Sequence, residues 1–137
     1  MRSNRICLKV EQTYTQDLIV LDRASLVLPY PPSVNTYWRS NGKRRFISKA
    51  GVDFSNEVQS IVYHQNKQWF GERRLKVNII IYPRSKRLFD LDNCLKAILD
   101  ALMKAGCYAD DSQVDFLHIE RGIQTKGGGC EVEIIAV

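Results

Sequence analysis

A short apolar segment near the middle of the chain predicts a central β-strand. Residues 75–82 read Leu-Lys-Val-Asn-Ile-Ile-Ile-Tyr, which begins with alternating apolar and polar side chains and finishes as a continuous apolar run. That pattern is typical of a strand inside a sheet. Pro83 follows directly, and because proline has no amide hydrogen it ends the pairing of the strand. We therefore expect a fold built on a sheet that contains residues 75–82.

One helix is predicted before this strand in the sequence and another after it. Ser48 can cap the first helix, which extends to about Trp69. Asp92 or Asn93 can cap the second, and Gly106 ends it. In each segment the residues that recur every three or four positions form one helical stripe: Val58, Ile61, Val62, Gln65 and Trp69 in the first, and Leu95, Ile98, Leu99, Leu102 and Met103 in the second.

Three further segments predict strands. Residues 24–30 are apolar and end at two prolines, while residues 114 to about 124 and residues 130–137 are separated by a turn at the glycine run 127–129. Two helices packed against one small mixed sheet form an α+β fold, a two-layer sandwich. We expect this fold class for residues 24–137, preceded by an accessory N-terminal extension at residues 1–23.

The segment between the first strand and the first helix is basic. Asn41-Gly42 suits a tight hairpin turn, and Lys43, Arg44 and Arg45 follow it, so we expect a basic hairpin or loop. Trp38 lies just before this turn. Its ring can stack on a nucleic-acid base or pack in the core, and the sequence does not decide between these roles.

The composition limits the class of protein. A chain of 137 residues is long enough for one domain. Its four cysteines form no C-x-x-C pair, which favours free thiols over a zinc site or a disulfide framework. His64 and His118 have no second histidine or cysteine at ligand spacing, so we expect them at the surface or packed. No run of about 18 apolar residues is present, so we expect no membrane span and a cytoplasmic location.

The net charge favours an anionic partner. Lysine and arginine number 20 against 15 aspartate and glutamate, a formal charge of +5, which is compatible with nucleic-acid binding but also occurs in proteins without such a partner. Three basic clusters suit phosphate contacts if the fold brings them together: Lys43-Arg44-Arg45, Arg73-Arg74-Lys76 and Arg84-Lys86-Arg87.

Acidic residues at the start of the second helix predict a metal site. In an extended Asp-x-Asp segment alternate side chains point the same way, so Asp90 and Asp92 can converge on one hard cation. Lys96 follows Asp92 by one helical turn, so its ammonium can reach the same place. Asp111 can join them only if the segment after the helix folds back, because a helix of about 14 residues spans about 20 Å. Otherwise this acid comes from the partner chain of a dimer.

Each of these residues also has a purely structural interpretation. Asp92 can cap the helix, and Asp90 and Asp92 can form ion pairs with the preceding basic residues. Lys96 can pair with Asp100 four residues later, a contact worth a few tenths of a kcal/mol. Asp110-Asp111 can form a turn. The occurrence of all these charged residues together favours the metal site over the separate structural roles.

Several segments, in this order, resemble the RusA family of Holliday-junction resolvases, small phage and prophage enzymes that cut four-way DNA junctions. They cover about residues 24–137, and the combination is more specific than any one of them: Leu28-Pro29-Tyr30-Pro31-Pro32-Ser33-Val34-Asn35, Asp90-Leu91-Asp92-Asn93 with Lys96, Asp100-Ala101-Leu102-Met103-Lys104-Ala105-Gly106, Asp110-Asp111-Ser112-Gln113-Val114 and Thr125-Lys126-Gly127-Gly128. The chain departs from the family pattern in its N-terminal extension and in carrying Leu88-Phe89 where a longer basic run often precedes the first acid.

The resemblance implies which residues act in catalysis. Asp90, Asp92 and Asp111 correspond to the essential acids, which would hold Mg2+, and Lys96 corresponds to a lysine required for cleavage. It also implies a homodimer, whose two symmetric sites nick opposing strands, and cleavage next to cytosine pairs. We expect DNA contacts from Arg84, Lys86, Arg87, Lys43, Arg44, Arg45 and Lys126.

The function expected from the sequence is that of a metal-dependent endonuclease. It would resolve four-way branched DNA in recombination and repair by paired phosphodiester cleavage. Two alternatives remain: a protein that binds branched DNA without cutting it, and a nuclease for another branched or single-stranded nucleic acid.

Overall fold

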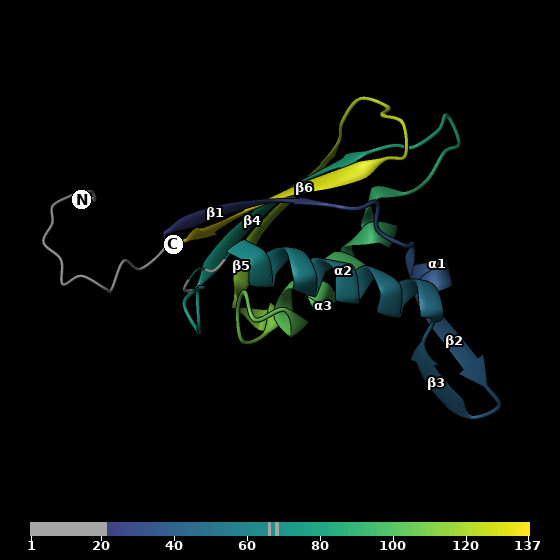
Figure 1. Cartoon of the computed structure of the whole chain (residues 1–137), viewed down its shortest axis with the longest axis horizontal. Coiled ribbons are helices and arrows are strands. Elements are labelled where there is room, and N and C mark those ends of the chain that lie inside the picture. Colours follow the sequence, from purple (N-terminus) through teal and green to yellow (C-terminus); the bar gives the residue numbers. More distant parts are fainter. Residues whose placement is uncertain (1–21, 66, 68) are drawn as a thin grey trace, which may run out of the picture.

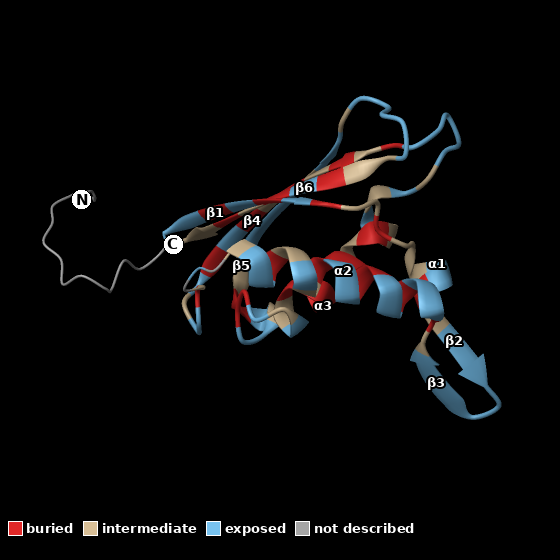
Figure 2. Ribbon diagram, viewed as in Figure 1, coloured by how far each residue is buried: buried red, intermediate tan, exposed pale blue. Residues whose placement is uncertain are grey.

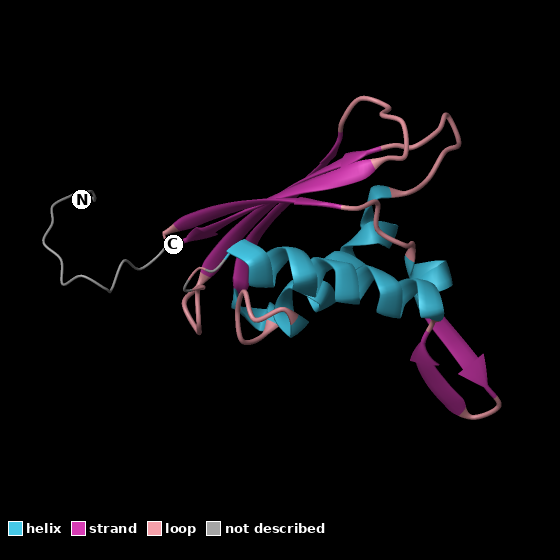
Figure 3. Ribbon diagram, in the orientation of Figure 1, coloured by secondary structure: helices cyan, strands magenta, loops and turns pink. Residues whose placement is uncertain are grey.

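The computed structural model describes residues 22–65, 67 and 69–137, and it confirms the α+β class. Its main sheet has the strand order β1-β6-β4-β5, in which β6 is antiparallel to both of its neighbours and β4 is parallel to β5 (Figures 1 and 3). A separate hairpin pairs β2 with β3. The strands are β1 (Arg23–Leu28), β2 (Trp38–Asn41), β3 (Arg44–Ile47), β4 (Leu75–Tyr82), β5 (Val114–Arg121) and β6 (Gly129–Ala136).

The core lies between the sheet and two helices, α2 (Lys49–Gln65) and α3 (Leu95–Lys104), which cover one face of it (Figures 1 and 2). Alternate side chains of β4, from Leu75 to Ile81, are fully buried on that face. Those on the other face are only partly buried or exposed. The predicted central strand is therefore confirmed with its bounds, because β6 and β5 pair with both of its edges.

The first predicted helix begins where expected and ends early. The Ser48 hydroxyl accepts a hydrogen bond from the Gly51 amide at 3.1 Å, which is the expected cap. The helix ends at Gln65, so the predicted extension to Trp69 is wrong. Phe70 is buried, and its amide donates to the Cys107 carbonyl at 3.0 Å. This tertiary contact draws the chain away from the helix axis.

The second predicted helix begins differently from the prediction. Neither Asp92 nor Asn93 caps it, because the chain first forms a short 3-10 helix, η1 (Leu91–Cys94), with Asp90 at its N-cap position and no side-chain cap. The Asn93 amide donates to the Asp90 carbonyl at 3.1 Å, which closes this tighter turn. At the other end Gly106 adopts φ +88, so the predicted helix stop is confirmed.

The basic hairpin is confirmed and extends away from the body (Figure 1). Gly42 adopts φ +65 in its turn. A two-stranded hairpin is barely stable alone, and its base is held by Ser48, which bonds to the Tyr37 carbonyl through its amide and to the Thr36 carbonyl through its hydroxyl. A one-turn helix, α1 (Val34–Tyr37), precedes the hairpin and was not predicted.

Two other expectations concern the cysteines and the first 23 residues. Cys94, Cys107 and Cys130 are free thiols, as predicted, and all three are buried. Cys7 and residues 1–21 of the predicted extension lie outside the described residues. In the described part of the chain, no helix has the length and apolar character to cross a membrane.

A second 3-10 helix, η2 (Asp111–Gln113), is held in place by a capping box that precedes β5. The Asp110 carboxylate accepts from the Ser112 amide, and the Gln113 side chain accepts from the Asp110 amide at 2.7 Å. The buried amide group of Gln113 also donates to the Gly71 and Arg73 carbonyls, each at 2.8 Å. Asp110 therefore has a structural role, and Gln113 fixes where Asp111 lies.

Replacing Gln113 with alanine should lower the free energy of unfolding by about 2–3 kcal/mol, because three backbone groups lose a buried partner. Urea denaturation measures this change. The exposed Gln124→Ala variant is the control and should change stability by about 0.5 kcal/mol or less. A Gln113→Ala loss no larger than that of the control would show that η2 does not depend on this side chain.

Candidate active site on the third helix

Three charged residues lie at four-residue spacing along η1 and α3. They are Asp92, Lys96 and Asp100, so they share one face of the helical segment. The Lys96 ammonium donates to Asp100 Oδ1 at 3.1 Å, so the predicted pair within the helix is present. Asp100 is 7% exposed, whereas about half of the Lys96 side chain reaches solvent.

Tyr37 of α1 completes the surroundings of Asp100. Its hydroxyl donates to Asp100 Oδ2 at 3.0 Å, so each oxygen of this buried carboxylate accepts a hydrogen bond. Burial and the hydrogen bond to Asp100 raise the pKa of Tyr37, which stays a neutral donor. The contact links the base of the hairpin to the middle of α3.

Asp111 lies close to the same group. The segment after α3 folds back along the helix, and the Tyr108 hydroxyl donates to the Leu99 carbonyl at 2.9 Å. Burial raises the pKa of Asp111, the negative charge of Asp100 raises it further, and the nearby Tyr108 hydroxyl and Lys96 ammonium lower it. One oxygen, Asp111 Oδ1, is buried and has no hydrogen-bond partner among the residues that the structure describes. A buried carboxylate oxygen without a donor is costly, and a cation would satisfy it.

The other two predicted acids are exposed at the start of η1. Asp90 and Asp92 are not joined to Asp111 in one cluster: in the described residues, no group of three or more His, Cys, Asp or Glu side chains is arranged to hold a metal ion. The structure therefore brings Asp111 to Lys96 and Asp100, and it places Asp92 in η1, one turn before Lys96, and Asp90 at the N-cap of η1. We call these five residues, Asp90, Asp92, Lys96, Asp100 and Asp111, the acidic strip.

Asp100 is the residue of the acidic strip that sequence reasoning did not select. The spacing predicts it as a partner of Lys96 and the resemblance includes it in a motif, yet neither predicts that it is the buried charge at the centre of the contacts. Its position eight residues after Asp92 was the available signal, because that spacing puts both on one helical face.

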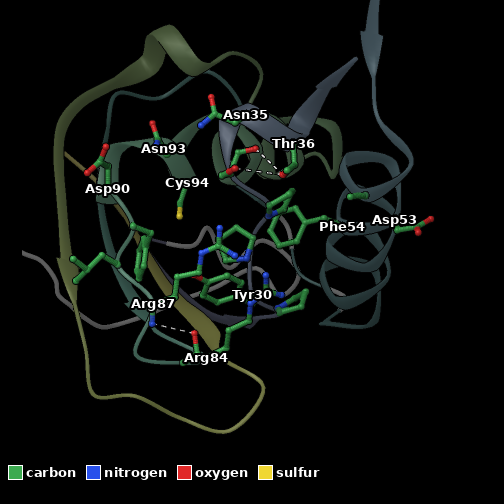
Figure 4. A pocket seen from close by; sticks show the side chains of 18 of the residues that line it. Tyr30, Asn35, Thr36, Asp53, Phe54, Arg84, Arg87, Asp90, Asn93 and Cys94 are labelled. Atoms are coloured by element: carbon green, nitrogen blue, oxygen red, sulfur yellow. Dashed lines mark hydrogen bonds between the residues drawn. The ribbon is translucent and has the colours of Figure 1, made fainter. Parts of the chain in front are cut away.

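A cavity of about 850 Å³ adjoins the acidic strip at Asp90 (Figure 4). Its walls are the proline-rich loop after β1, the first turns of α2, and the loop between β4 and η1. In the close-up, Asn35, Asn93 and Asp90 lie along one side, Phe54 of α2 lies opposite, and Arg84 and Arg87 lie below.

The predicted DNA-binding residues lie in three exposed places. Arg84, Lys86 and Arg87 follow β4, and two of them, Arg84 and Arg87, line the cavity. Lys43, Arg44 and Arg45 lie on the hairpin, and Lys126 lies in the loop before β6. The cluster Arg73-Arg74-Lys76 is at the opposite end of β4, where Arg74 pairs with Asp115, so the fold does not join it to the others.

Trp38, His64 and His118 each contact other groups of the protein. Trp38 is partly buried, and its ring lies edge to face with Tyr37 at 5.3 Å and under the Arg45 guanidinium at 4.6 Å. It therefore packs at the base of the hairpin. His64 and His118 are exposed, as expected, and their ring nitrogens contact the Ser60 carbonyl and the Glu120 carboxylate.

Comparison with known proteins agrees with the resemblance of the motifs. The family model described as endodeoxyribonuclease RusA matches residues 29–135. The chain is 39% identical over 114 residues to the crossover junction endodeoxyribonuclease RusA of Enterobacteria phage HK97, covering 83% of this chain and 95% of the relative. It is 37% and 36% identical over 110 residues to the proteins of that name from Shigella sonnei and Escherichia coli K12, covering 80% of this chain and 92% of each. The chain belongs to the RusA family of endodeoxyribonucleases.

Proposed function

We propose that this protein is a Mg2+-dependent endonuclease that resolves four-way DNA junctions by paired cleavage in recombination and repair. The observation that carries the proposal is the acidic strip, in which Asp111 presents, beside the Lys96 ammonium, a buried oxygen that has no donor in the described part of the chain. The names of the relatives, crossover junction endodeoxyribonucleases, support the same reaction and substrate. We place its action in the cytoplasm, where bacterial and phage DNA is found.

The proposed metal ligands are Asp90, Asp92 and Asp111. Carboxylate oxygens are the ligands that Mg2+ prefers, and because it keeps several of its waters it needs few carboxylates. The unpartnered Asp111 Oδ1 fits this requirement. When bound, the ion would supply a Lewis acid and an activated water for phosphodiester hydrolysis. Asp111 would join Asp90 and Asp92 either within one subunit or across a homodimer.

A homodimer suits a symmetric junction, because two equivalent sites can act on opposing strands. The outer edge of β5 supports association with a second copy. Phe116 and Leu117 are 58% and 44% exposed on this strand, and within the described residues its backbone pairs only with β4 in the sheet. An unpaired edge with exposed apolar side chains favours pairing between chains.

The residues of the chain itself have distinct roles in this proposal. Lys96 places a positive charge where negative charge develops on the scissile phosphate, which is a large contribution in enzymes of this kind. Asp100 holds that ammonium and is held by Tyr37, so both are positioning residues. Arg84, Lys86 and Arg87 directly precede the acids and would hold phosphates of the cleaved strand, which offsets the repulsion between carboxylates and DNA.

A protein that binds branched DNA without cutting it is the second candidate. The capping role of Asp110 and the Lys96–Asp100 ion pair favour it, because both give these charges a structural purpose. Magnesium-dependent nicking of a labelled junction separates the two functions.

Asp90→Asn should reduce junction cleavage by about 10²-fold or more, because it removes a ligand charge while the side-chain volume hardly changes. Binding to the junction without metal and the melting temperature should stay near those of the wild type. The matched control is Asp110→Asn, since asparagine caps a helix as well as aspartate does. Cleavage by Asp90→Asn near the wild-type rate would remove Asp90 from the site.

Lys96→Ala should lower the single-turnover rate on saturating enzyme by about 10²-fold. Removing Lys96 also leaves one oxygen of the buried Asp100 carboxylate without its donor, so the free energy of unfolding should fall by about 1–3 kcal/mol. Lys49→Ala breaks an exposed pair of the same spacing, Lys49–Asp53 on α2, so both the stability and the cleavage rate should change little. Similar rates for the two variants would leave Lys96 only a structural role.

Replacing Lys43, Arg44 and Arg45 with glutamine should weaken metal-free junction binding and reduce its dependence on salt. Each lost phosphate contact lowers the slope of log K against log salt by about 0.9. A titration of binding between low and moderate salt measures this. The control removes Lys67 and Lys104, exposed lysines near the C-terminal ends of the two main helices. An unchanged slope in the hairpin variant would place the DNA elsewhere.

A further inference from the structure

The proline-rich loop gives the cavity beside Asp90 a rigid wall. Pro29, Pro31 and Pro32 each have a restricted φ, and they line the cavity with Tyr30. Gly128 packs behind this wall with φ +70, and a Cβ there would lie 2.6 Å from the Tyr30 ring and 2.9 Å from Arg84 Cβ. The fit holds Tyr30 in place, so this wall is formed before any ligand binds.

Flat surfaces line the same wall. The Tyr30 and Phe89 rings meet edge to face at 6.2 Å, and the Arg84 guanidinium lies 4.8 Å from the centre of the Tyr30 ring. All three residues line the cavity. Aromatic rings and guanidinium planes are the surfaces on which proteins stack unpaired bases.

Polar groups line the rest of the cavity. The amides of Asn35 and Asn93 lie on the side of Asp90 (Figure 4), and Glu57 contributes a carboxylate from α2. Amides both donate and accept, and a carboxylate accepts from an amino group, so together they match the edge of a nucleobase. Arg87 adds a positive charge at the lower side, which suits the phosphate of the same nucleotide.

The volume suits one base that is turned out of its helix. About 850 Å³ is the size of a small-molecule pocket and is enough for one nucleotide, and a base enters such a concave site when it leaves its stack. Base extrusion costs least where the base is already unpaired or weakly stacked. A strand exchange point provides such bases, and an intact duplex does not.

We propose that this cavity receives one unpaired base of the branched strand, turned out of its stack beside the scissile phosphate at Asp90. The inference rests on the proposed function and adds to it a base-binding site. Selection of branched over linear DNA follows, because only a branch point delivers a base to the cavity at low cost.

Photocrosslinking tests the proposal on the full protein. Junctions that carry 4-thiothymidine at single positions around the exchange point are bound without metal and irradiated, and crosslinked peptides are identified by mass spectrometry. We expect one position next to the exchange point to crosslink to Tyr30 or Phe89, and the same nucleotide in a linear duplex not to. Crosslinks from the exchange-point positions that map only outside the cavity would overturn the proposal.

The second measurement compares the crosslink yield of the wild type with that of a variant whose new side chain fills the cavity. Ala50 is exposed on the first turn of α2 and lines the cavity, so Ala50→Phe should lower the crosslink yield about tenfold or more, the loss expected for one stacked base. Val52→Phe is the control, because Val52 is 43% exposed on the same helix and does not line the cavity. Equal yields in the two variants would also overturn the proposal.

Cleavage by the wild-type protein distinguishes a failure of the base-binding proposal from a failure of the proposed function. If the protein cuts junctions with Mg2+ but shows no crosslink in the cavity, the base-binding site is wrong and the proposed function stands. If it neither binds nor cuts junctions, the proposed function itself fails.

Discussion

The buried carboxylate of Asp100 is the constraint on which the candidate site depends. A charge with 7% exposure is tolerated only when it is well paired, and here Tyr37 and Lys96 each donate to one of its oxygens. The Tyr37 bond ties the base of the hairpin to α3, and the Lys96 bond directs the ammonium along the acidic strip. Losing either partner would leave a charge that water cannot reach.

Asp111 adds a second carboxylate close to that of Asp100, and the two negative charges repel each other. Burial and the charge of Asp100 raise the pKa of Asp111, while the Lys96 ammonium only partly offsets them. The fold nevertheless keeps Asp111 there, because the capping box and the bonds from Gln113 to two carbonyls fix the preceding turn. Such a site is strained without additional positive charge, which is the electrostatic condition that a metal ion or a phosphate-bound cation relieves.

Prediction from the sequence succeeded where a local pattern decides the structure and failed where tertiary contacts do. The apolar run 75–82, the Ser48 cap and the Gly106 stop depend on neighbouring residues, and all three were predicted. The contact of Phe70 with Cys107 shortens α2, and no periodicity could show it. In the same way the Lys96–Asp100 pair follows from spacing, whereas the contact of Tyr37 with Asp100 joins residues 63 positions apart. The roles of Asp90, Asp92 and Asp111 in metal binding stay a prediction.

The placement of positive charge separates affinity from selectivity. Under the proposed function, cations on the extended hairpin would contact the phosphates of any DNA arm and would strengthen binding without recognising a branch. Selection must then arise near the acids, where Arg84 and Arg87 are part of a walled cavity. In the proposed mechanism the scissile phosphate lies at the acidic strip, so a base in the adjoining cavity would hold the strand in register with it. A linear duplex held only by the hairpin would therefore be bound and left uncut.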